Sequence, residues 1–265
     1  MTPDDISAAA SALVEAERTN TQMRLISGDH PGMDMDAAYA VQARVVAAKE
    51  AAGAKRIGWK IGLTSRAMQQ ALGIDIPDSG VLFDDMHFET GGRVPAGRFI
   101  EPRVEAEIAF VLKSDIAGAA TRAEVLAATD YVCPSLEILD TRILRRDPDT
   151  GATRKVFDTI ADNAANAGVV LGAARHAPDA HDLAWVGALV RRDGVVEETG
   201  LGGGVLGDPV QGLVWLSERL ETYGDVMRAG DIVLSGSFIR PIECPPGSSI
   251  DADFGAFGQV SISFD

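Results

Sequence analysis

Cysteine is scarce in this sequence of 265 residues, which contains only two, Cys133 and Cys244. Two cysteines cannot build a disulfide framework, and no CxxC pair is present for a metal or redox centre. We therefore expect the protein to work in a reducing compartment, the cytoplasm.

Long apolar runs and basic residues are also in short supply. No window approaches ~18 uninterrupted apolar residues, so we expect no membrane span. The N-terminus has no basic cluster, which predicts a helix rather than a signal peptide. The 24 Lys and Arg against 39 Asp and Glu give a formal net charge of −15. Such an acidic chain is a poor partner for nucleic acid, and an anionic substrate would need a locally positive site.

The chain divides into a helical start and a strand-dominated remainder. Residues 1–55 are rich in Ala, Leu and Glu with apolar residues at three- and four-residue spacing, which predicts helices. The second helix, over 36–52, has Asp36 as a candidate N-cap and Gly53 as its end. Residues 56–265 show no linker or composition break. We expect an α+β fold in which the helical segment 1–55 packs on a β-rich catalytic domain, 56–265.

The main domain gives several local predictions. Alternating apolar residues from Val104 to Leu112 are the strongest strand signal in the chain. The other elements are strands over 56–63 and 131–143, the latter interrupted by Pro134, a helix over 65–73, a turn over 77–80, a capping box from Thr121 to Glu124, a polar loop over 145–155, a hairpin at Asp193-Gly194, and a helix over 208–224.

Glu105, Glu107 and Glu137 are candidate metal ligands. Residues two apart on a strand share a face, so Glu105 and Glu107 project together. Paired carboxylates in an enclosed place repel each other, and a divalent cation removes that cost. Oxygen ligands favour Mg²⁺ or Ca²⁺, with Mn²⁺ as an alternative. A solvated outer face of the strand would explain the same spacing.

Lys60 and Asp78 are the candidate acid/base residues. Lys60 lies in GWKIGLTS between apolar neighbours, where lysine is seldom buried without a partner. It is either the partner of a bound anion or a catalytic base, or an edge-strand lysine whose head reaches water. Asp78 lies in IPDSG, where an Asx-turn is the ordinary interpretation.

Taken together, these residues resemble the fumarylacetoacetate hydrolase superfamily, and most closely its 2-oxo-acid hydratase and decarboxylase branch. The resemblance runs from about residue 26 to the C-terminus. The motifs that carry it are AAYAVQ, GWKIGLTS, PDSGVLFDDM, EPRVEAEIAFVL, PSLEILDTRI, RKVFDTIADNAANAG, PVQGLVWL, AGDIVLSGSF and DFGAFG. Two positions depart from the usual family pattern, which often has Tyr at Ser79 and His or Asn at Asp208.

The resemblance implies a mixed β-sandwich-like roll and a homo-oligomer. It implies a Mg²⁺ site, or Mn²⁺, on Glu105, Glu107 and Glu137. It also implies active-site roles for Lys60 and Asp78, and it places Ser237 near the substrate. The implied activity is hydration of a 2-oxo acid, with 2-oxohept-4-ene-1,7-dioate as the first choice.

A seven-carbon diacid has a second carboxylate, and a basic loop offers partners for it. One of Arg145, Arg146, Arg154 or Lys155 is expected to bind that group, although a solvated surface loop has the same composition. The alternatives are 2-oxopent-4-enoate hydration, 4-oxalocrotonate decarboxylation, and a non-catalytic role stabilising a pathway enzyme such as a decarboxylase.

Overall fold

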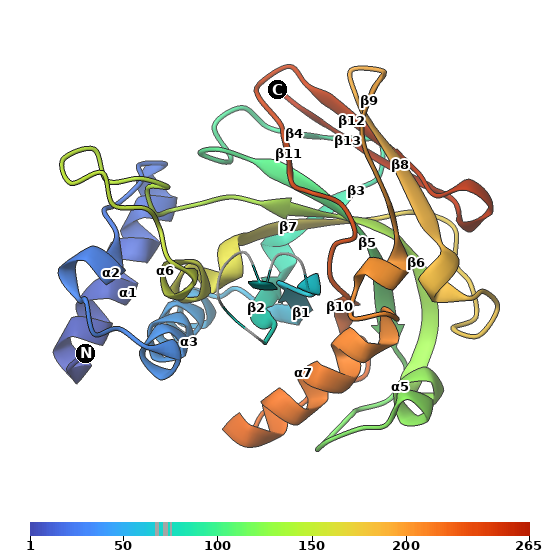
Figure 1. Ribbon diagram of the computed structural model, residues 1–265, viewed down its shortest axis with the longest axis horizontal. Coiled ribbons are helices and arrows are strands. Elements are labelled where there is room, and N and C mark those ends of the chain that lie inside the picture. Colours follow the sequence, from blue (N-terminus) through green and yellow to red (C-terminus); the bar gives the residue numbers. More distant parts are fainter. Residues whose placement is uncertain (67–68, 71–73, 75) are drawn as a thin grey trace.

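The computed structural model describes residues 1–66, 69–70, 74 and 76–265. The helix expected over 65–73 lies largely outside the described residues. Elsewhere the fold is α+β, with two curled sheets and helices on their flanks (Figure 1). The described helices are α1 (Pro3–Thr19), α2 (Ile26–Asp29), α3 (Met35–Ala51), α5 (Arg122–Ala128), α6 (Val156–Ala161) and α7 (Val210–Tyr223).

The N-terminal helices begin at side-chain caps. Thr2 and Asp5 form a capping box at the start of α1. The cap of α3 is Asp34, whose carboxylate accepts a hydrogen bond from the Ala37 amide at 2.9 Å. The expectation of Asp36 as the cap was therefore wrong, since Asp36 lies inside the first turn. Acidic residues at both positions suit a helix N-terminus, and backbone geometry decides between them.

The larger sheet contains the strands that carry the candidate site. Its order is β2-β1-β10-β5-β6-β7-β3, with β11 pairing to β5. Pairing is antiparallel except between β1 and β10 and between β3 and β7. The strands are β1 (Arg56–Gly62), β2 (Asp78–Phe83), β3 (His87–Glu89), β5 (Arg103–Leu112), β6 (Thr129–Leu139), β7 (Asn166–Leu171), β10 (Ile232–Leu234) and β11 (Ile242–Glu243).

The smaller sheet packs over the larger one and shares its core. Its order is β4-β13-β12-β8-β9, and it lies at the top of Figure 1. The hairpin between β8 and β9 turns at Asp193-Gly194, as predicted, with positive φ at both residues. Such a turn matches the twist of the strands. The strands are β4 (Gly92–Val94), β8 (Gly187–Arg192), β9 (Val195–Leu201), β12 (Ser249–Asp253) and β13 (Gln259–Phe264).

The strand β5 is central because its alternation separates core from site. Its even-numbered residues from Val104 to Leu112 are at most 2% exposed and join one core cluster with both sheets and α7. Its partner β6 continues through Pro134, which pairs with Ile108. The expected interruption at Pro134 was therefore wrong.

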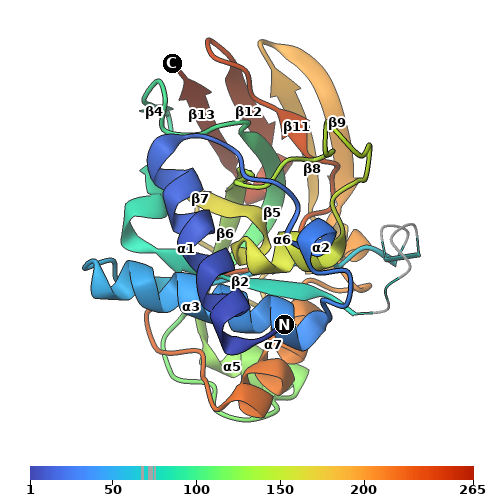
Figure 2. The same ribbon diagram turned by 90° about the vertical axis from the view of Figure 1, so that its left-hand side faces the viewer.

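The helices α1, α2, α3 and α6 form a second layer beside this core. Their apolar cluster includes Leu13, Val41 and Ile160, and it also takes in Ile143 from the chain after β6. Figure 2 shows α1, α2 and α3 together on one side of the molecule. None of the described helices is long and apolar enough to cross a membrane.

The sheet edge at β2 is closed by side chains. Asp78, Ser79 and Gly80 belong to β2, so the turn expected over 77–80 was wrong for these three residues. The Asn163 amide accepts from the Val81 amide at 2.8 Å and donates to its carbonyl at 2.9 Å. The outward backbone groups of this strand are therefore satisfied without a neighbouring strand.

A buried ion pair holds the turn that carries Asn163. Residues 163–165 all have positive φ, an arrangement that costs energy for residues other than glycine. Arg142 donates from Nε to Asp162 Oδ1 at 2.6 Å and from Nη2 to the Asp162 carbonyl at 2.8 Å. Both side chains are buried, so this pair anchors the turn in a place where water cannot substitute for either partner.

We expect Arg142→Ala to lower the free energy of unfolding by about 3–5 kcal/mol, because it leaves a carboxylate buried without its partner. Urea denaturation measures the loss. Arg122→Ala is the matched control, since it breaks the exposed ion pair with Asp208 and should cost less than about 1 kcal/mol. Equal, small losses in both variants would contradict the anchoring role of Arg142.

Candidate functional site

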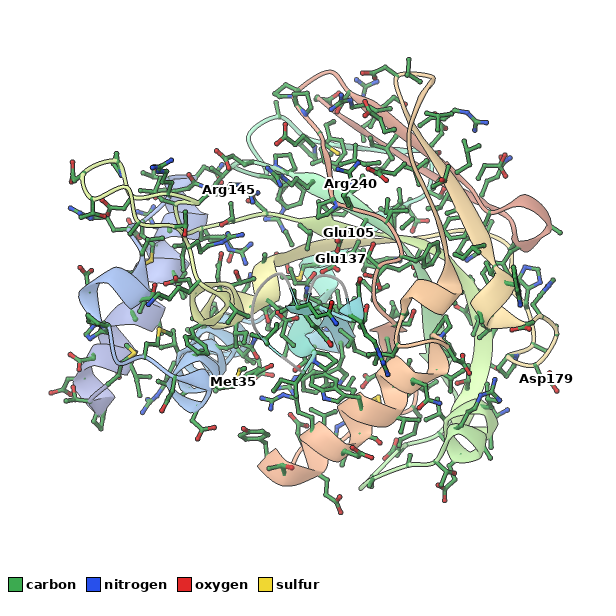
Figure 3. All side chains as sticks on the ribbon, viewed as in Figure 1. Met35, Glu105, Glu137, Arg145, Asp179 and Arg240 are labelled. Atoms are coloured by element: carbon green, nitrogen blue, oxygen red, sulfur yellow. The ribbon has the colours of Figure 1, made fainter. Side chains whose placement is uncertain are left out.

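Three carboxylates meet where β5 and β6 pair. Glu105 and Glu107 share a face of β5, and Glu137 lies directly across from Glu105 on β6. One oxygen from each carboxylate can be chosen so that all three lie within 4.8 Å of one another. The predicted convergence of Glu105, Glu107 and Glu137 is thus present in the structure. Figure 3 shows Glu105 and Glu137 close together in the interior of the molecule.

The oxygens of this triad are poorly satisfied by the protein itself. Glu107 Oε2 accepts a hydrogen bond from the Gly236 amide at 2.8 Å. Glu107 Oε1 and both oxygens of Glu137 are buried and have no hydrogen-bond partner among the described residues. Of these oxygens, Glu137 Oε1 has a charged neighbour, Lys60 Nζ at 3.4 Å. Buried carboxylate oxygens without hydrogen bonds are expensive unless they bind a cation. These donors therefore fit a hard divalent cation such as Mg²⁺, Mn²⁺ or Ca²⁺.

The pKa values of all three carboxyl groups are raised by their surroundings. Burial, followed by the negative charge of Glu137, raises the pKa of Glu105 to about 8. Burial and both neighbouring carboxylates raise the pKa of Glu107 well above its ordinary value. Burial also raises the pKa of Glu137, although Lys60 opposes the effect. A bound cation would relieve this repulsion.

Lys60 is the positive group beside the triad. It lies in β1, its side chain is buried, and its Nζ is 3.4 Å from Glu137 Oε1. Burial alone would lower the pKa of Lys60, but the carboxylates of Glu137 and Asp78 outweigh it and raise that pKa above the ordinary value. The ammonium is therefore charged at neutral pH, and the edge-strand alternative, with the head in water, does not hold.

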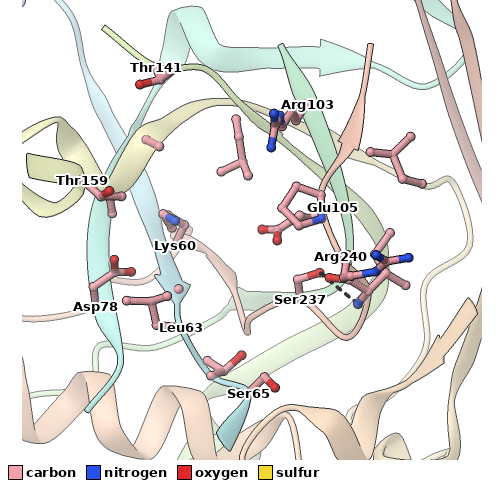
Figure 4. A pocket seen from close by; sticks show the side chains of 18 of the residues that line it. Lys60, Leu63, Ser65, Asp78, Arg103, Glu105, Thr141, Thr159, Ser237 and Arg240 are labelled. Atoms are coloured by element: carbon pink, nitrogen blue, oxygen red, sulfur yellow. Dashed lines mark hydrogen bonds between the residues drawn. The ribbon is translucent and has the colours of Figure 1, made fainter. Parts of the chain in front are cut away.

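Asp78 approaches Lys60 across Gly62. Asp78 pairs with Gly62 in the β1–β2 ladder. A Cβ atom on Gly62 would lie 2.2 Å from Asp78 Oδ1 and 3.0 Å from Lys60 Nζ. Only glycine leaves room for both side chains there. Burial raises the pKa of Asp78, and the Lys60 charge opposes this rise. Figure 4 shows Lys60, Asp78 and Glu105 facing one cavity.

The cavity has a volume of about 1030 Å³ and is lined by most of the predicted site residues. Ser237 lines it, but its hydroxyl is committed to the backbone of Ile239, donating at 2.9 Å and accepting at 3.2 Å. Arg146 is not part of the lining, and its Nε donates to the Gly151 carbonyl at 3.1 Å. The predicted residues that do line the cavity are Lys60, Asp78, Glu105, Arg145, Arg154, Lys155 and Ser237.

One side of this cavity is positively charged. Burial and the neighbouring Arg103 lower the pKa of Arg145, and burial and Arg145 lower that of Arg154. Arg145 pairs with Glu101 at 3.3 Å. Arg154 has no carboxylate within ion-pair distance in the described chain; its guanidinium bonds the Thr141 hydroxyl. This half-buried arginine is therefore free to bind an anion.

Arg103 is a cavity residue that was not predicted, although the strand pattern around it contains a signal. Arg103 lines the cavity and pairs with Glu243 at 2.7 Å. It lies two residues before Glu105 on β5, and the alternation that brings Glu105 and Glu107 together also places Arg103 on their face. Arg192 and Arg240 also line the cavity, and they come from segments with no comparable pattern.

Comparison with known proteins identifies the family. No family model matches the chain. It is 48% identical over 256 residues to a 2-oxo-hept-4-ene-1,7-dioate hydratase of Escherichia coli, covering 96% of both chains. It is 37% identical over 266 residues to a 2-keto-4-pentenoate hydratase of Paraburkholderia xenovorans (strain LB400), covering 100% of this chain and 97% of the other.

The chain belongs to the 2-oxo-acid hydratase and decarboxylase branch of the fumarylacetoacetate hydrolase superfamily. The two relatives just named are hydratases, which are hydro-lyases, and this member of the branch is an enzyme of that class. The expected family is therefore confirmed.

Solved structures agree with the expected roll. A 4-oxalocrotonate decarboxylase from Pseudomonas putida G7, complexed with magnesium and adipate, has a TM-score of 0.93 at 30% identity, covering 100% of this chain and 99% of that one. A fumarylacetoacetate hydrolase from Exiguobacterium antarcticum has a TM-score of 0.59 at 14% identity, covering 80% of this chain and 76% of that one, a likeness of fold alone.

We expect Glu107→Gln to abolish metal binding and yet to stabilise the metal-free protein. The neutral amide can still accept the Gly236 hydrogen bond, and it removes a carboxyl group whose raised pKa shows that its ionised form is costly to bury, so the gain at neutral pH should be about 1–3 kcal/mol. Urea denaturation in EDTA and titration with Mg²⁺ measure the two effects. Glu218→Gln, an exposed change on α7, should alter neither. A destabilised variant that still binds Mg²⁺ would contradict the metal-ligand assignment.

Proposed function

We propose that this enzyme adds water to 2-oxohept-4-ene-1,7-dioate, giving 4-hydroxy-2-oxoheptane-1,7-dioate, in aromatic (homoprotocatechuate) catabolism. The observation that carries the proposal is one cavity lined by Lys60, by Glu105 of the carboxylate triad, and by Arg154, an arginine without a carboxylate partner in the described chain. A seven-carbon substrate with a charged group at each end matches this arrangement. The similarity to the Escherichia coli hydratase supports the same choice.

Glu105, Glu107 and Glu137 would hold the metal, which we propose to be Mg²⁺, with Mn²⁺ as the alternative. When bound, the cation supplies a Lewis acid for the carboxylate and keto oxygens at the 2-oxo-acid end of the substrate. The protein supplies the remainder of the site. Glu107 and Glu137 are buried away from water, and the Gly236 amide orients Glu107 through its hydrogen bond.

Lys60 and Asp78 form the proposed acid/base unit. The reaction removes a proton from C3, delivers one to C5, adds the hydroxyl of water to C4, and returns a proton to C3. The net change is the addition of one water across the C4–C5 double bond. Side chains that move these protons must come within hydrogen-bond reach of C3 and C5. The convergence of Lys60 and Asp78 around Gly62 supports their assignment to this task.

We assign the distal carboxylate of the substrate to the positively charged side of the cavity, which contains Arg103, Arg145 and Arg154. Arg154 is its proposed main partner, because it is half-buried, charged and without a carboxylate of its own. Arg145 and Arg103 add positive potential, although each already has an acidic partner. Lys155 is exposed at the cavity edge. Of the four residues in the original hypothesis, Arg146 has the weakest support, because its side chain serves the loop backbone.

Two related reactions remain alternatives. Hydration of 2-oxopent-4-enoate is favoured by the Paraburkholderia xenovorans relative. Decarboxylation of 4-oxalocrotonate is favoured by the structure solved with magnesium and adipate, a six-carbon diacid. Loss of the dienoate ultraviolet absorbance in Mg²⁺, with and without release of CO₂, separates these activities. Absence of turnover, together with improved turnover of an added decarboxylase, would favour the non-catalytic role.

The organisation of the chain is also part of the proposal. We place the boundary between the helical segment and the catalytic domain at residues 55 and 56, and we expect a homo-oligomer that can associate with a pathway decarboxylase. A cytoplasmic location agrees with two cysteines that are both free and buried.

We expect Asp78→Asn and Lys60→Met each to lower kcat by about 10²–10⁴-fold, the usual contribution of a positioned proton donor or acceptor. Affinity for Mg²⁺ should remain within about threefold in Asp78→Asn, since Asp78 is outside the triad. Stopped-flow absorbance and titration with Mg²⁺ provide the two readouts. Retention of full kcat in either variant would remove that residue from the acid/base unit.

We expect Arg154→Ala to lower kcat/KM for the seven-carbon diacid by about 10- to 100-fold, the loss of one charged hydrogen bond. Activity on 2-oxopent-4-enoate, which has no distal carboxylate, should change less than about threefold. Arg146→Ala is the matched control from the same loop and should leave both substrates unaffected. Equal losses on both substrates would contradict a role in binding the distal carboxylate.

A further inference from the structure

The strand that carries Asp78 is held by a helix rather than by a second strand. In the sheet order β2 has β1 on one side only. The Ser79 amide donates to Tyr39 Oη at 3.2 Å, and the Ser79 carbonyl accepts from Gln42 Nε2 at 2.8 Å. Both side chains come from α3, and both are buried. Two side chains therefore take the place of a neighbouring backbone.

A third contact reaches the same residue from α7. Arg219 Nε donates to Ser79 Oγ at 3.3 Å. Its guanidinium carbon lies 3.5 Å from the ring centre of Tyr39 and 4.4 Å from that of Tyr223. Stacking between two rings restricts a side chain that is otherwise flexible. Every polar group of Ser79 thus has a partner from a helix.

Asp78 depends on these contacts because its own carboxylate has few hydrogen-bond partners. Its side chain is buried, and Oδ1 has no hydrogen-bond partner among the described residues. An edge strand without such partners frays easily. The position of the Asp78 carboxylate beside Lys60 therefore depends on the backbone of β2, which pairs with β1 on one side and is held through Ser79 on the other.

We propose that Tyr39, Gln42 and Arg219, the Ser79 clamp, are positioning residues for the reaction. They hold Ser79, and Ser79 holds Asp78 at the distance from Lys60 that proton transfer requires. The inference rests on the proposed acid/base role of Asp78. It gives a function to the AAYAVQ motif, in which Tyr39 and Gln42 are three residues apart and so share one face of α3.

The clamp is separate from the metal site. The carboxylate triad is on β5 and β6, and the hydrogen bonds of the clamp all end on β2 or, for a second bond from Gln42, on the Ile160 carbonyl. Displacing Asp78 should therefore slow the chemical step without weakening the binding of Mg²⁺. Misplacement of a reacting group by about 1 Å can cost on the order of 10²-fold in rate.

The test compares Tyr39→Phe, Gln42→Ala and Arg219→Gln in the full-length protein. Tyr39→Phe keeps the ring that stacks on Arg219 and removes only the acceptor for the Ser79 amide. We expect kcat for the seven-carbon diacid at saturating Mg²⁺ to fall about 10- to 100-fold in Gln42→Ala. KM and the Kd for Mg²⁺ alone should stay within about threefold in all three variants.

Conservative and matched variants sharpen the comparison. Arg219→Lys keeps a charged donor, so it should retain more activity than Arg219→Gln. Arg175→Gln is the control, since the Arg175 guanidinium also stacks on a tyrosine, 4.4 Å from the Tyr131 ring centre, but lies outside the cavity lining. Its kcat should be unchanged. Circular dichroism verifies that each variant is folded.

The inference is overturned if folded Tyr39→Phe and Gln42→Ala retain wild-type kcat. It is also overturned if kcat and Mg²⁺ affinity fall together, because that result indicates general loosening of the fold. Asp78→Asn, measured in parallel, distinguishes failure of the acid/base role of Asp78 from failure of the Ser79 clamp. A fully active Asp78→Asn removes the proposed acid/base role itself. An inactive Asp78→Asn beside fully active clamp variants removes only the clamp.

Discussion

Repulsion among three closely spaced carboxylates, two of them buried and Glu105 half-buried at the cavity, is the main physical constraint in this structure. Glu105, Glu107 and Glu137 are brought together by the register of two central strands. One backbone amide and one lysine are the groups that oppose their charge most closely. A protein gains no stability from such an arrangement without a cation. We therefore interpret the triad as a cation-binding site whose cost in stability is met by the rest of the fold.

The surrounding fold holds the three carboxylates in place. The other face of β5 is sealed in the core between the two sheets, so the carboxylates cannot retreat from one another. Gly62 lets Asp78 and Lys60 close the other side. The same architecture addresses the charge problem posed by a net charge of −15. With a cation on the triad, Lys60 and the lining arginines Arg103, Arg145 and Arg154 would offset the acidic side chains around the cavity, so that two anionic groups could be held apart in one site.

Part of this site could be read from the sequence, because strand alternation is a local rule. This rule placed Glu105 and Glu107 on one face of the strand. The same rule places Arg103 on that face, although no role was predicted for it. Glu137 is different, since cross-strand register depends on long-range pairing. It could be named as a third carboxylate in an apolar strand, and the family resemblance implied the same ligand, but no local rule placed it opposite Glu105. The cap of α3 was misassigned by two residues, because Asp34 and Asp36 both suit a helix start and geometry alone separates them.

The sequence around Asp78 has the composition of a turn, yet it forms a strand. The contacts responsible come from α3, α7 and the segment at residue 163, which are remote in the chain. No local pattern reports such contacts.

Locating the metal ion in a crystal decides whether one divalent cation binds to Glu105, Glu107 and Glu137. A crystal grown with Mn²⁺ and oxalate, which resembles the 2-oxo-acid end of the substrate, allows the metal to be placed by its anomalous scattering. The account predicts a single strong peak bound by oxygens of Glu105, Glu107 and Glu137, with oxalate completing its coordination on the side that faces Lys60. A peak elsewhere in the cavity, or an empty triad in crystals that bind Mn²⁺ at another site, would contradict it.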